Sequence, residues 1–125
     1  MGLLMQLFSK AYQAVHGAAD VPEITVEELK ALMDKKEDFL LLDVREKSEY
    51  EICSIPGAKL IPMGDVVDKV GELDKDKAIV VHCHHGGRSA RVAQYLKKNG
   101  FKQVVNLAGG IEDWADKIDP AMKKY

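Results

Sequence analysis

Short apolar runs alternate with amphipathic stretches along most of this chain. The runs at 39–44 and 78–82 are rich in leucine, isoleucine and valine and have the length of strands buried on both faces. Shorter strands are predicted at 59–61 and 104–106, and helices at 26–35, 47–52, 65–70, 89–99 and after the glycines at 109–110. This alternation predicts a small doubly wound α/β domain, in which helices cover both faces of a parallel sheet.

Local signals at helix ends support these elements. Thr25 and Glu28 have the spacing of a capping box at the start of the helix at 26–35. Ser89 opens the helix at 89–99, and Gly100 stands where a C′ glycine ends a helix. Two consecutive glycines at 109–110 predict a turn with unusual backbone angles before the last helix.

The first twenty residues form a segment of their own, so we expect a helix and linker over 1–20 and one domain over 21–125. Apolar side chains between Leu3 and Val15 recur at helical spacing and predict an amphipathic helix over 3–15, with a linker at 16–20. This helix is too short to cross a bilayer, and no positive charge precedes it as in a signal peptide. Three uses remain: packing on the domain, pairing with a second copy in a homodimer, or lying on a membrane, which is least favoured because the helix holds one lysine and no arginine.

Composition narrows the classes of partner. The 125 residues suit one domain, and a net charge of −2 gives no overall basic field, so nucleic acid is not an expected partner. The two cysteines, Cys53 and Cys83, do not indicate a disulfide framework. A reactive thiol suits a reducing compartment, and we expect a cytoplasmic protein that needs no cofactor.

Cys83 is the strongest candidate for chemistry, because it stands where a buried strand becomes a glycine-rich loop and then a helix. Gly86 and Gly87 allow a tight curl in which successive N–H groups turn inward and form a nest for negative charge. The helix N-terminus and Arg88 add positive potential, and together these features lower the pKa of a thiol. The alternative is an inert buried cysteine, which the surrounding glycines and charges disfavour.

Four stretches, in order, resemble signatures of the rhodanese family of sulfurtransferases. They are Leu-Leu-Asp-Val-Arg-Glu at 41–46, Ile-Pro-Gly-Ala at 55–58, the loop Cys-His-His-Gly-Gly-Arg at 83–88, and Asn-Leu-Ala-Gly-Gly-Ile-Glu-Asp-Trp at 106–114. The resemblance covers about residues 22–118 and implies the rhodanese-like fold. One position departs from the family: a histidine is frequent before the Ile-Pro-Gly-Ala stretch, and this chain has Ser54.

The family resemblance implies a reaction in two steps. Cys83 would be the catalytic nucleophile that takes sulfur from a donor such as thiosulfate, and a thiol or a protein would accept it, with cyanide as acceptor in an assay. The substrate would lie among His84, His85, Gly86, Gly87, Arg88 and Ser89, whose N–H groups would stabilise the terminal sulfur of the persulfide. Arg88 has two possible roles, which are attraction of an anionic donor and bracing of the loop against a carboxylate.

Loop length bears on the alternatives. Cysteine phosphatases have five residues between cysteine and arginine, whereas only four separate Cys83 from Arg88, and the tighter loop favours sulfur over a phosphoryl group. A phosphatase or arsenate reductase is therefore the less favoured enzyme. A non-catalytic interaction module that retains the fold is a further alternative, and the presence of Cys83 argues against it.

The histidines allow two interpretations. His84 and His85 could shape the mouth of the loop, carry partial charge toward an anionic donor, or move a proton to an acceptor, whereas His82 belongs to the strand and is expected to be a packing residue. A metal cluster of these residues with Cys83 is disfavoured, because contiguous residues on a strand point to opposite faces and metal ligands are usually spaced apart. No metal site is therefore predicted.

Four more residues complete the predictions. Asp43 and Arg45 follow the strand at 39–44, at the edge of the sheet where ligands bind, and we expect them to support the active-site loop through hydrogen bonds. Cys53 could resolve the persulfide if it approached Cys83, but a half-buried structural thiol is favoured. Trp114 is expected in the core rather than at a recognition surface.

Overall fold

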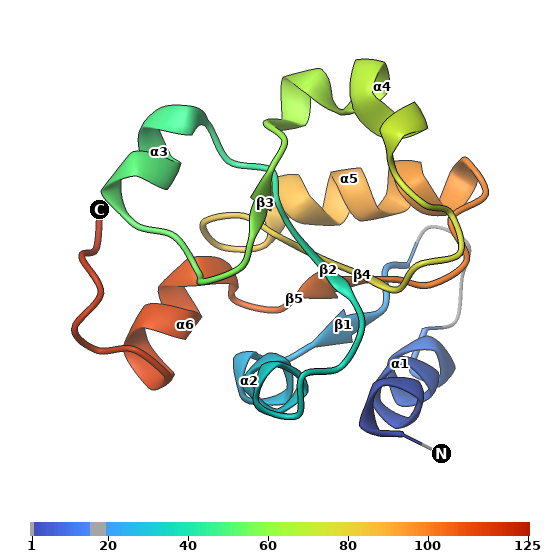
Figure 1. Cartoon of the computed structure of the whole chain (residues 1–125), viewed down its shortest axis with the longest axis horizontal. Helices are drawn as coiled ribbons and strands as arrows, with labels where there is room; N and C mark the ends of the chain where they lie inside the picture. Colours follow the sequence, from blue (N-terminus) through green and yellow to red (C-terminus); the bar gives the residue numbers. More distant parts are fainter. Residues whose placement is uncertain (1, 16–19) are drawn as a thin grey trace.

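A computed structural model describes residues 2–15 and 20–125 and shows a five-stranded sheet in which every pair of neighbours is parallel (Figure 1). The spatial order is β1-β5-β4-β2-β3. The strands are β1 (Glu23–Ile24), β2 (Leu40–Asp43), β3 (Lys59–Leu60), β4 (Ile79–His82) and β5 (Val104–Leu107). The prediction of a parallel α/β sheet is therefore confirmed.

Helices cover both faces of this sheet, as a doubly wound domain requires (Figure 1). On one face lie α1 (Leu3–Gln13), α2 (Val26–Asp34) and α6 (Gly110–Lys117), and on the other α4 (Val66–Lys69) and α5 (Gly87–Lys98). Each face has its own apolar core: Leu29, Leu32 and Trp114 pack on the first, and Val92, Ala93 and Leu96 on the second. Trp114 is thus a core residue, as predicted.

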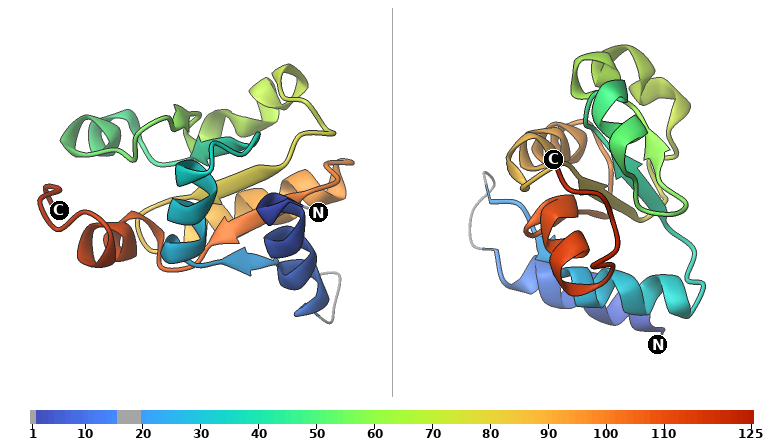
Figure 2. Two further views of the ribbon diagram at one scale, coloured as in Figure 1. Left: turned by 60° about the horizontal axis from the view of Figure 1, so that its bottom comes forward. Right: turned by 90° about the vertical axis from the view of Figure 1, so that its left-hand side faces the viewer.

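The remaining helix, α3 (Lys47–Ile52), follows β2, and the C-terminal segment runs from α6 back toward it (Figure 2). A hydrogen bond of 2.8 Å from the Tyr125 hydroxyl to Glu49 joins this segment to α3. The end of the chain therefore lies beside the carboxyl edge of the sheet.

Helix α1 packs on its own domain. Phe8 and Ala11 are buried in the core, and the Tyr12 hydroxyl accepts a hydrogen bond from the Val104 backbone N–H at 2.7 Å. Of the three uses that the sequence left open for this helix, the structure therefore shows packing on the domain. Of the predicted linker, residues 16–19 lie outside the described residues. Among the helices that the structure describes, none has both the length and the apolar character needed to cross a membrane.

Several element boundaries differ from the sequence predictions. The two-residue strand β1 was not predicted, because it is too short to show a period of two. Helix α5 begins at Gly87 rather than at Ser89, and α1 ends at Gln13. The helix expected at 65–70 is one α-turn at Val66–Lys69 flanked by short 3₁₀ turns. The capping box of Thr25 and Glu28 is confirmed, with backbone-to-side-chain bonds of 2.9 and 3.1 Å.

The strand register brings the candidate residues to one edge of the sheet. Asp43 pairs with His82 across β2 and β4, and Val81 pairs with Asn106 across β4 and β5. Because all strands are parallel, Cys83 leaves the sheet at the same carboxyl edge.

Candidate active site

The Cys83 thiol lies inside its own loop, with 1% of the residue exposed. Its sulfur accepts hydrogen bonds from the backbone N–H groups of Gly86 at 3.2 Å and Ser89 at 3.4 Å, and the Ser89 hydroxyl lies 3.3 Å away. Burial raises the pKa of Cys83, and hydrogen bonds from the backbone N–H groups of Ser89 and Gly86 lower it. The net pKa is lowered when the Ser89 hydroxyl also donates to the sulfur. The loop is therefore built to hold negative charge at this sulfur.

The two loop glycines differ in what the backbone requires. Gly86 has a φ of +118°, a left-handed conformation that favours glycine, and it stands immediately before α5. Gly87 is the first residue of α5, and a Cβ built there meets no atom within 4 Å. The curl of the loop thus depends on Gly86, whereas Gly87 leaves open space beside the loop.

The glycine turn at the start of α6 supports the Cys83 loop through backbone hydrogen bonds. Gly109 and Gly110 have φ values of +79° and +60°, as the sequence predicted for this turn. The N–H of Ile111 donates to the carbonyl of Cys83 at 2.9 Å, and that of Glu112 donates to the carbonyl of His84 at 3.1 Å. A Cβ at Gly110 would lie only 2.4 Å from the His84 carbonyl oxygen. The start of α6 therefore fixes the outward direction of the loop carbonyls.

Arg88 points to a carboxylate on α3. Its two terminal nitrogens lie 2.7 and 2.9 Å from the two carboxylate oxygens of Glu49, which is the geometry of a bidentate ion pair. The Arg88 guanidinium lowers the pKa of Glu49 to about 2, with burial acting in the opposite direction. Of the two roles left open for Arg88, this contact favours bracing of the loop.

Asp43 and Arg45 form a fully buried ion pair at the end of β2. The Arg45 guanidinium lies 2.7 Å from an Asp43 carboxylate oxygen, and it also donates to the Cys53 carbonyl at 2.7 Å and to the Tyr125 hydroxyl at 2.9 Å. These contacts anchor the end of α3 and the C-terminal segment. Because α3 carries Glu49, the pair supports the active-site loop indirectly, through Arg88.

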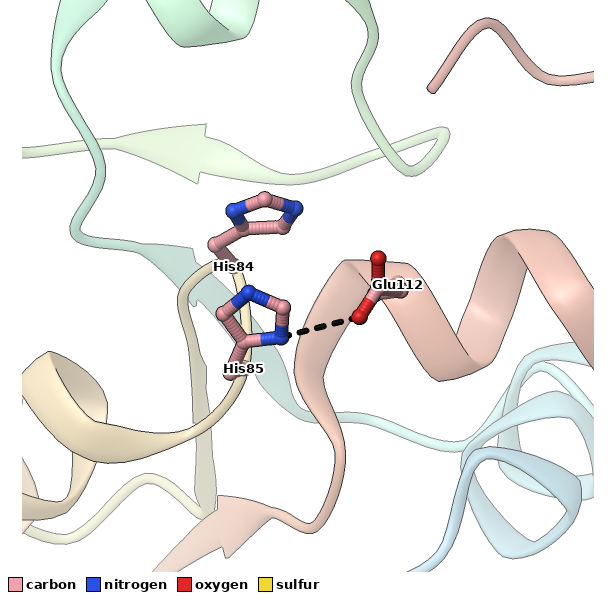
Figure 3. Close-up of side chains that lie close together, drawn as sticks. All are labelled: His84, His85 and Glu112. Atoms are coloured by element: carbon pink, nitrogen blue, oxygen red, sulfur yellow. Dashed lines mark ion pairs between the residues drawn. The ribbon is translucent and has the colours of Figure 1, made fainter. Parts of the chain in front are cut away.

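His84 and His85 lie at the mouth of the loop with Glu112 of α6, where the possible ligand atoms of the three are within 4.8 Å of one another (Figure 3). The Nδ1 atom of His85 lies 3.0 Å from the Glu112 carboxylate. The two imidazole rings stack at 4.0 Å with planes inclined by 27°, and His84 also stacks on Tyr125. Nitrogen lone pairs lie in the ring planes, so those of stacked rings do not converge on one ion, and we assign no metal here.

The pKa of His84 is lowered by burial and by the neighbouring His85. This ring is therefore largely neutral near pH 7, so that it does not add the positive charge toward an anionic donor that the sequence allowed. Its place between His85 and Tyr125 suits a residue that shapes the entrance of the loop.

His82 is buried in β4, as predicted, but it has an unusual environment. Neither ring nitrogen has a hydrogen-bond partner, and the Asp43 carboxylate lies 3.8 Å from Nε2. Burial lowers the pKa of His82 to about 4. The ring is thus held neutral next to the Asp43–Arg45 pair.

Cys53 is half-buried at the end of α3, and its sulfur lies 4.0 Å from an Arg45 nitrogen. This environment agrees with the structural role favoured from the sequence. Nothing in its contacts joins it directly to the Cys83 sulfur, so we keep it outside the catalytic group.

Sequence reasoning did not find Glu49, Asn106 or Tyr125 as members of the site. Asn106, on β5, accepts from the Ser89 hydroxyl at 2.5 Å and donates to the Gly86 carbonyl at 3.2 Å. The signal for Asn106 was its place at the start of a glycine-containing motif, at the end of an apolar strand. Glu49 and Tyr125 carry no comparable signal, because they meet the loop only through folding.

Comparisons with known proteins agree with this geometry. A family profile described as rhodanese-like domain matches residues 25–117. The chain is 42% identical over 102 residues to YrkF of Bacillus subtilis, whose name describes a candidate sulfur carrier protein; the match covers 82% of this chain and 55% of YrkF, so the chain spans about half of that relative. It is 38% identical over 95 residues to a sulfurtransferase of Allochromatium vinosum, which covers 76% of this chain and 89% of that protein.

A solved structure supports the same fold. The crystal structure of a rhodanese-like domain protein from Staphylococcus aureus has a TM-score of 0.71 and 36% identity, and the match covers 77% of this chain and 93% of that one. The family match, over residues 25–117, leaves residues 1–24 outside it.

Proposed function

The chain belongs to the rhodanese family, and on that premise we propose that it is a sulfurtransferase in which Cys83 carries the sulfur as a persulfide. One observation carries the proposal: the Cys83 sulfur accepts hydrogen bonds from the inward N–H groups of Gly86 and Ser89. Donors fixed around a buried sulfur stabilise a thiolate before reaction and an anionic outer sulfur after it.

The loading step follows from this placement. The Cys83 thiolate attacks the outer sulfur of a donor such as thiosulfate, the new S–S bond forms, and the old S–S bond breaks. Sulfite leaves with the electron pair of the broken bond, and the outer sulfur of the persulfide carries the negative charge.

The unloading step regenerates the free cysteine. A nucleophile attacks the outer sulfur, and the electron pair of the S–S bond returns to Cys83. In the cell this nucleophile would be the thiol of a small molecule or of a protein, and in an assay it is cyanide. The name of YrkF, a candidate sulfur carrier, favours a protein among the acceptors. His84 and His85 at the mouth of the loop are the side chains that an entering acceptor would meet first.

The contact of Arg88 favours this reaction over phosphate chemistry. A cysteine phosphatase needs its loop arginine for the transferred phosphoryl group, whereas both terminal nitrogens of Arg88 are paired with Glu49. The short spacing from Cys83 to Arg88 supports the same choice. The non-catalytic alternative has less support, because a module without chemistry does not need donors fixed on a buried sulfur.

Steady-state kinetics test the proposal. With thiosulfate and cyanide, the wild type should form thiocyanate with parallel double-reciprocal plots, since sulfite leaves before the acceptor reacts. Cys83→Ser should form none above background, and Cys53→Ser, the matched control at the other cysteine, should keep the rate. Hydrolysis of a phosphate ester without thiocyanate formation would instead identify a phosphatase.

A further inference from the structure

The Ser89 hydroxyl faces two acceptors with a single hydrogen. Its oxygen lies 3.3 Å from the Cys83 sulfur and 2.5 Å from the Asn106 side-chain oxygen. Ser89 is 0% exposed and Asn106 1% exposed, so solvent does not supply a second hydrogen-bond donor to these two acceptors. The direction of this one hydrogen therefore determines whether the Ser89 hydroxyl donates to the sulfur or presents a lone pair to it.

The orientation of the Asn106 amide is fixed by its other contacts. Its nitrogen donates to the Glu23 carboxylate at 2.9 Å and to the Gly86 carbonyl at 3.2 Å, and both of these groups are acceptors only. A flipped amide would place its oxygen against two other oxygens. The Asn106 oxygen must therefore face Ser89.

An amide oxygen carries no hydrogen, so the contact of 2.5 Å between it and the Ser89 oxygen requires the hydroxyl hydrogen to lie between them. Ser89 then presents a lone pair to Cys83. A thiol can donate its S–H to that lone pair, whereas a thiolate would be repelled until the hydroxyl turned and left the buried Asn106 oxygen without a donor.

We propose that Asn106 is a positioning residue that holds the Ser89 hydroxyl hydrogen away from Cys83 and so favours the thiol over the thiolate in the sulfur-free protein. The role of this effect in the reaction rests on the proposed function. In the persulfide the charge lies on the outer sulfur, and the inner sulfur no longer needs the hydroxyl. Asn106 therefore penalises the empty thiolate without penalising the loaded cysteine.

The charged groups near the loop do not take over this effect of Asn106 on the Cys83 sulfur, because their direct contacts are with other side chains. Arg88 on α5 acts on Cys83 through space but is paired with Glu49 on α3. Glu112 on α6 contacts His85, and Glu23 on β1 contacts Asn106. Further titratable neighbours at this edge of the sheet include Asp43 on β2 and its partner Arg45, His82 on β4, His84 in the loop, and Tyr125, whose hydroxyl contacts Arg45 and Glu49.

Titration of the thiol tests the proposal without any sulfur donor. In a Cys53→Ser background Cys83 is the single thiol, and the ultraviolet absorbance of the thiolate follows its ionisation with pH. Asn106→Leu removes the acceptor, and its apolar side chain, branched at the same carbon, excludes water. The freed Ser89 hydroxyl can then donate to the sulfur, so we expect the pKa of Cys83 to fall by about one unit, a tenfold gain of thiolate at a fixed pH.

Ser89→Ala is the decisive companion. We expect it not to raise the pKa of Cys83, and we expect Asn106→Leu to have no further effect in that background, because its action passes through the hydroxyl. A rise in Ser89→Ala would show that the hydroxyl already serves the sulfur and would overturn the proposal, even if Asn106→Leu failed to fold. A shift by Asn106→Leu that persisted without Ser89 would also overturn it. Failure of sulfur transfer itself would appear in thiocyanate formation and not in this titration.

Discussion

Arg88 and Glu49 join the candidate active-site loop to α3 through two parallel contacts of 2.7 and 2.9 Å. The two residues are 39 positions apart in the sequence, and each comes from a helix next to the carboxyl edge of the sheet. Because Glu49 occupies its guanidinium, Arg88 holds the loop in place. The backbone N–H groups then remain the principal hydrogen-bond donors to an anion at Cys83.

If Arg88 acts as a brace, Arg88→Ala and Glu49→Ala should have similar effects. We expect each to lower kcat/KM for thiosulfate by roughly tenfold to a hundredfold through displacement of the loop, and the double variant to be no worse than the poorer single variant. Steady-state kinetics of the three variants provide the comparison. An increase in KM for thiosulfate in Arg88→Ala alone would instead indicate that Arg88 binds the donor.

Gly110 should tolerate no side chain. A Cβ at this position would lie 2.4 Å from the His84 carbonyl oxygen and 2.6 Å from that of Cys83, and its φ of +60° is itself unfavourable for alanine. We expect Gly110→Ala to lower the free energy of unfolding in urea by about 2–4 kcal/mol and to reduce thiocyanate formation. The matched control is Gly64→Ala, where a Cβ meets nothing within 4 Å. Equal stability of the two variants would contradict this role of Gly110.

The buried His82 should make the fold sensitive to acid. Its folded pKa of about 4 lies below the usual value of 6.5, so the unfolded chain binds more protons between these values and stability falls as pH decreases from about 6.5 toward 4. From pH 7.5 to pH 5 this histidine should cost ~2 kcal/mol of unfolding free energy. Glu49, with a pKa of about 2, loses its contribution only below its usual value of 4.5.

Urea unfolding of His82→Leu at these two pH values measures the contribution of His82 to the pH dependence of the unfolding free energy. The variant should lose about 2 kcal/mol less than the wild type between pH 7.5 and pH 5. His85→Gln, at a side chain that is 64% exposed, should follow the wild type. An unchanged pH dependence in His82→Leu would show that His82 is not the group responsible.

Tyr12 completes the hydrogen bonding of β5 where the short strand β1 does not reach. Its hydroxyl accepts from the Val104 N–H at 2.7 Å and lies 3.2 Å from the Val104 carbonyl. Tyr12→Phe leaves these buried backbone groups without that partner, so we expect unfolding in urea to become easier by about 1–3 kcal/mol. Ser9→Ala, on an exposed part of α1, should change it by less than about 0.5 kcal/mol. A Tyr12→Phe variant as stable as the wild type would contradict the role of α1 in the domain.

The sequence could predict much of this arrangement because its signals are local. Cys83, Gly86 and Arg88 are close together along the chain, and the apolar runs around β2 and β4 have the length and composition of buried strands. Parallel pairing then places their ends together without further information. The fold class followed from these patterns, and the family followed from the resemblance of four short stretches to its signatures.

Other parts depend on contacts that no local pattern encodes. Glu49 is one of several acidic residues on an exposed-looking segment, and its role arises only when α3 meets the loop. Tyr125 reaches His84 because the chain folds back after α6. The competition between Asn106 and Cys83 for one hydroxyl hydrogen depends on the contrast between distances of 2.5 and 3.3 Å, which the sequence does not convey.

The persulfide on Cys83 can be measured most directly by intact mass after brief exposure to thiosulfate. The wild type should gain the mass of one sulfur atom and lose it when cyanide is added, as thiocyanate forms, while Cys83→Ser should gain none. A second donor, mercaptopyruvate, separates donor preference from absence of chemistry. If neither donor added sulfur to the wild type, or if Cys83→Ser gained it equally, sulfur transfer through Cys83 would be contradicted.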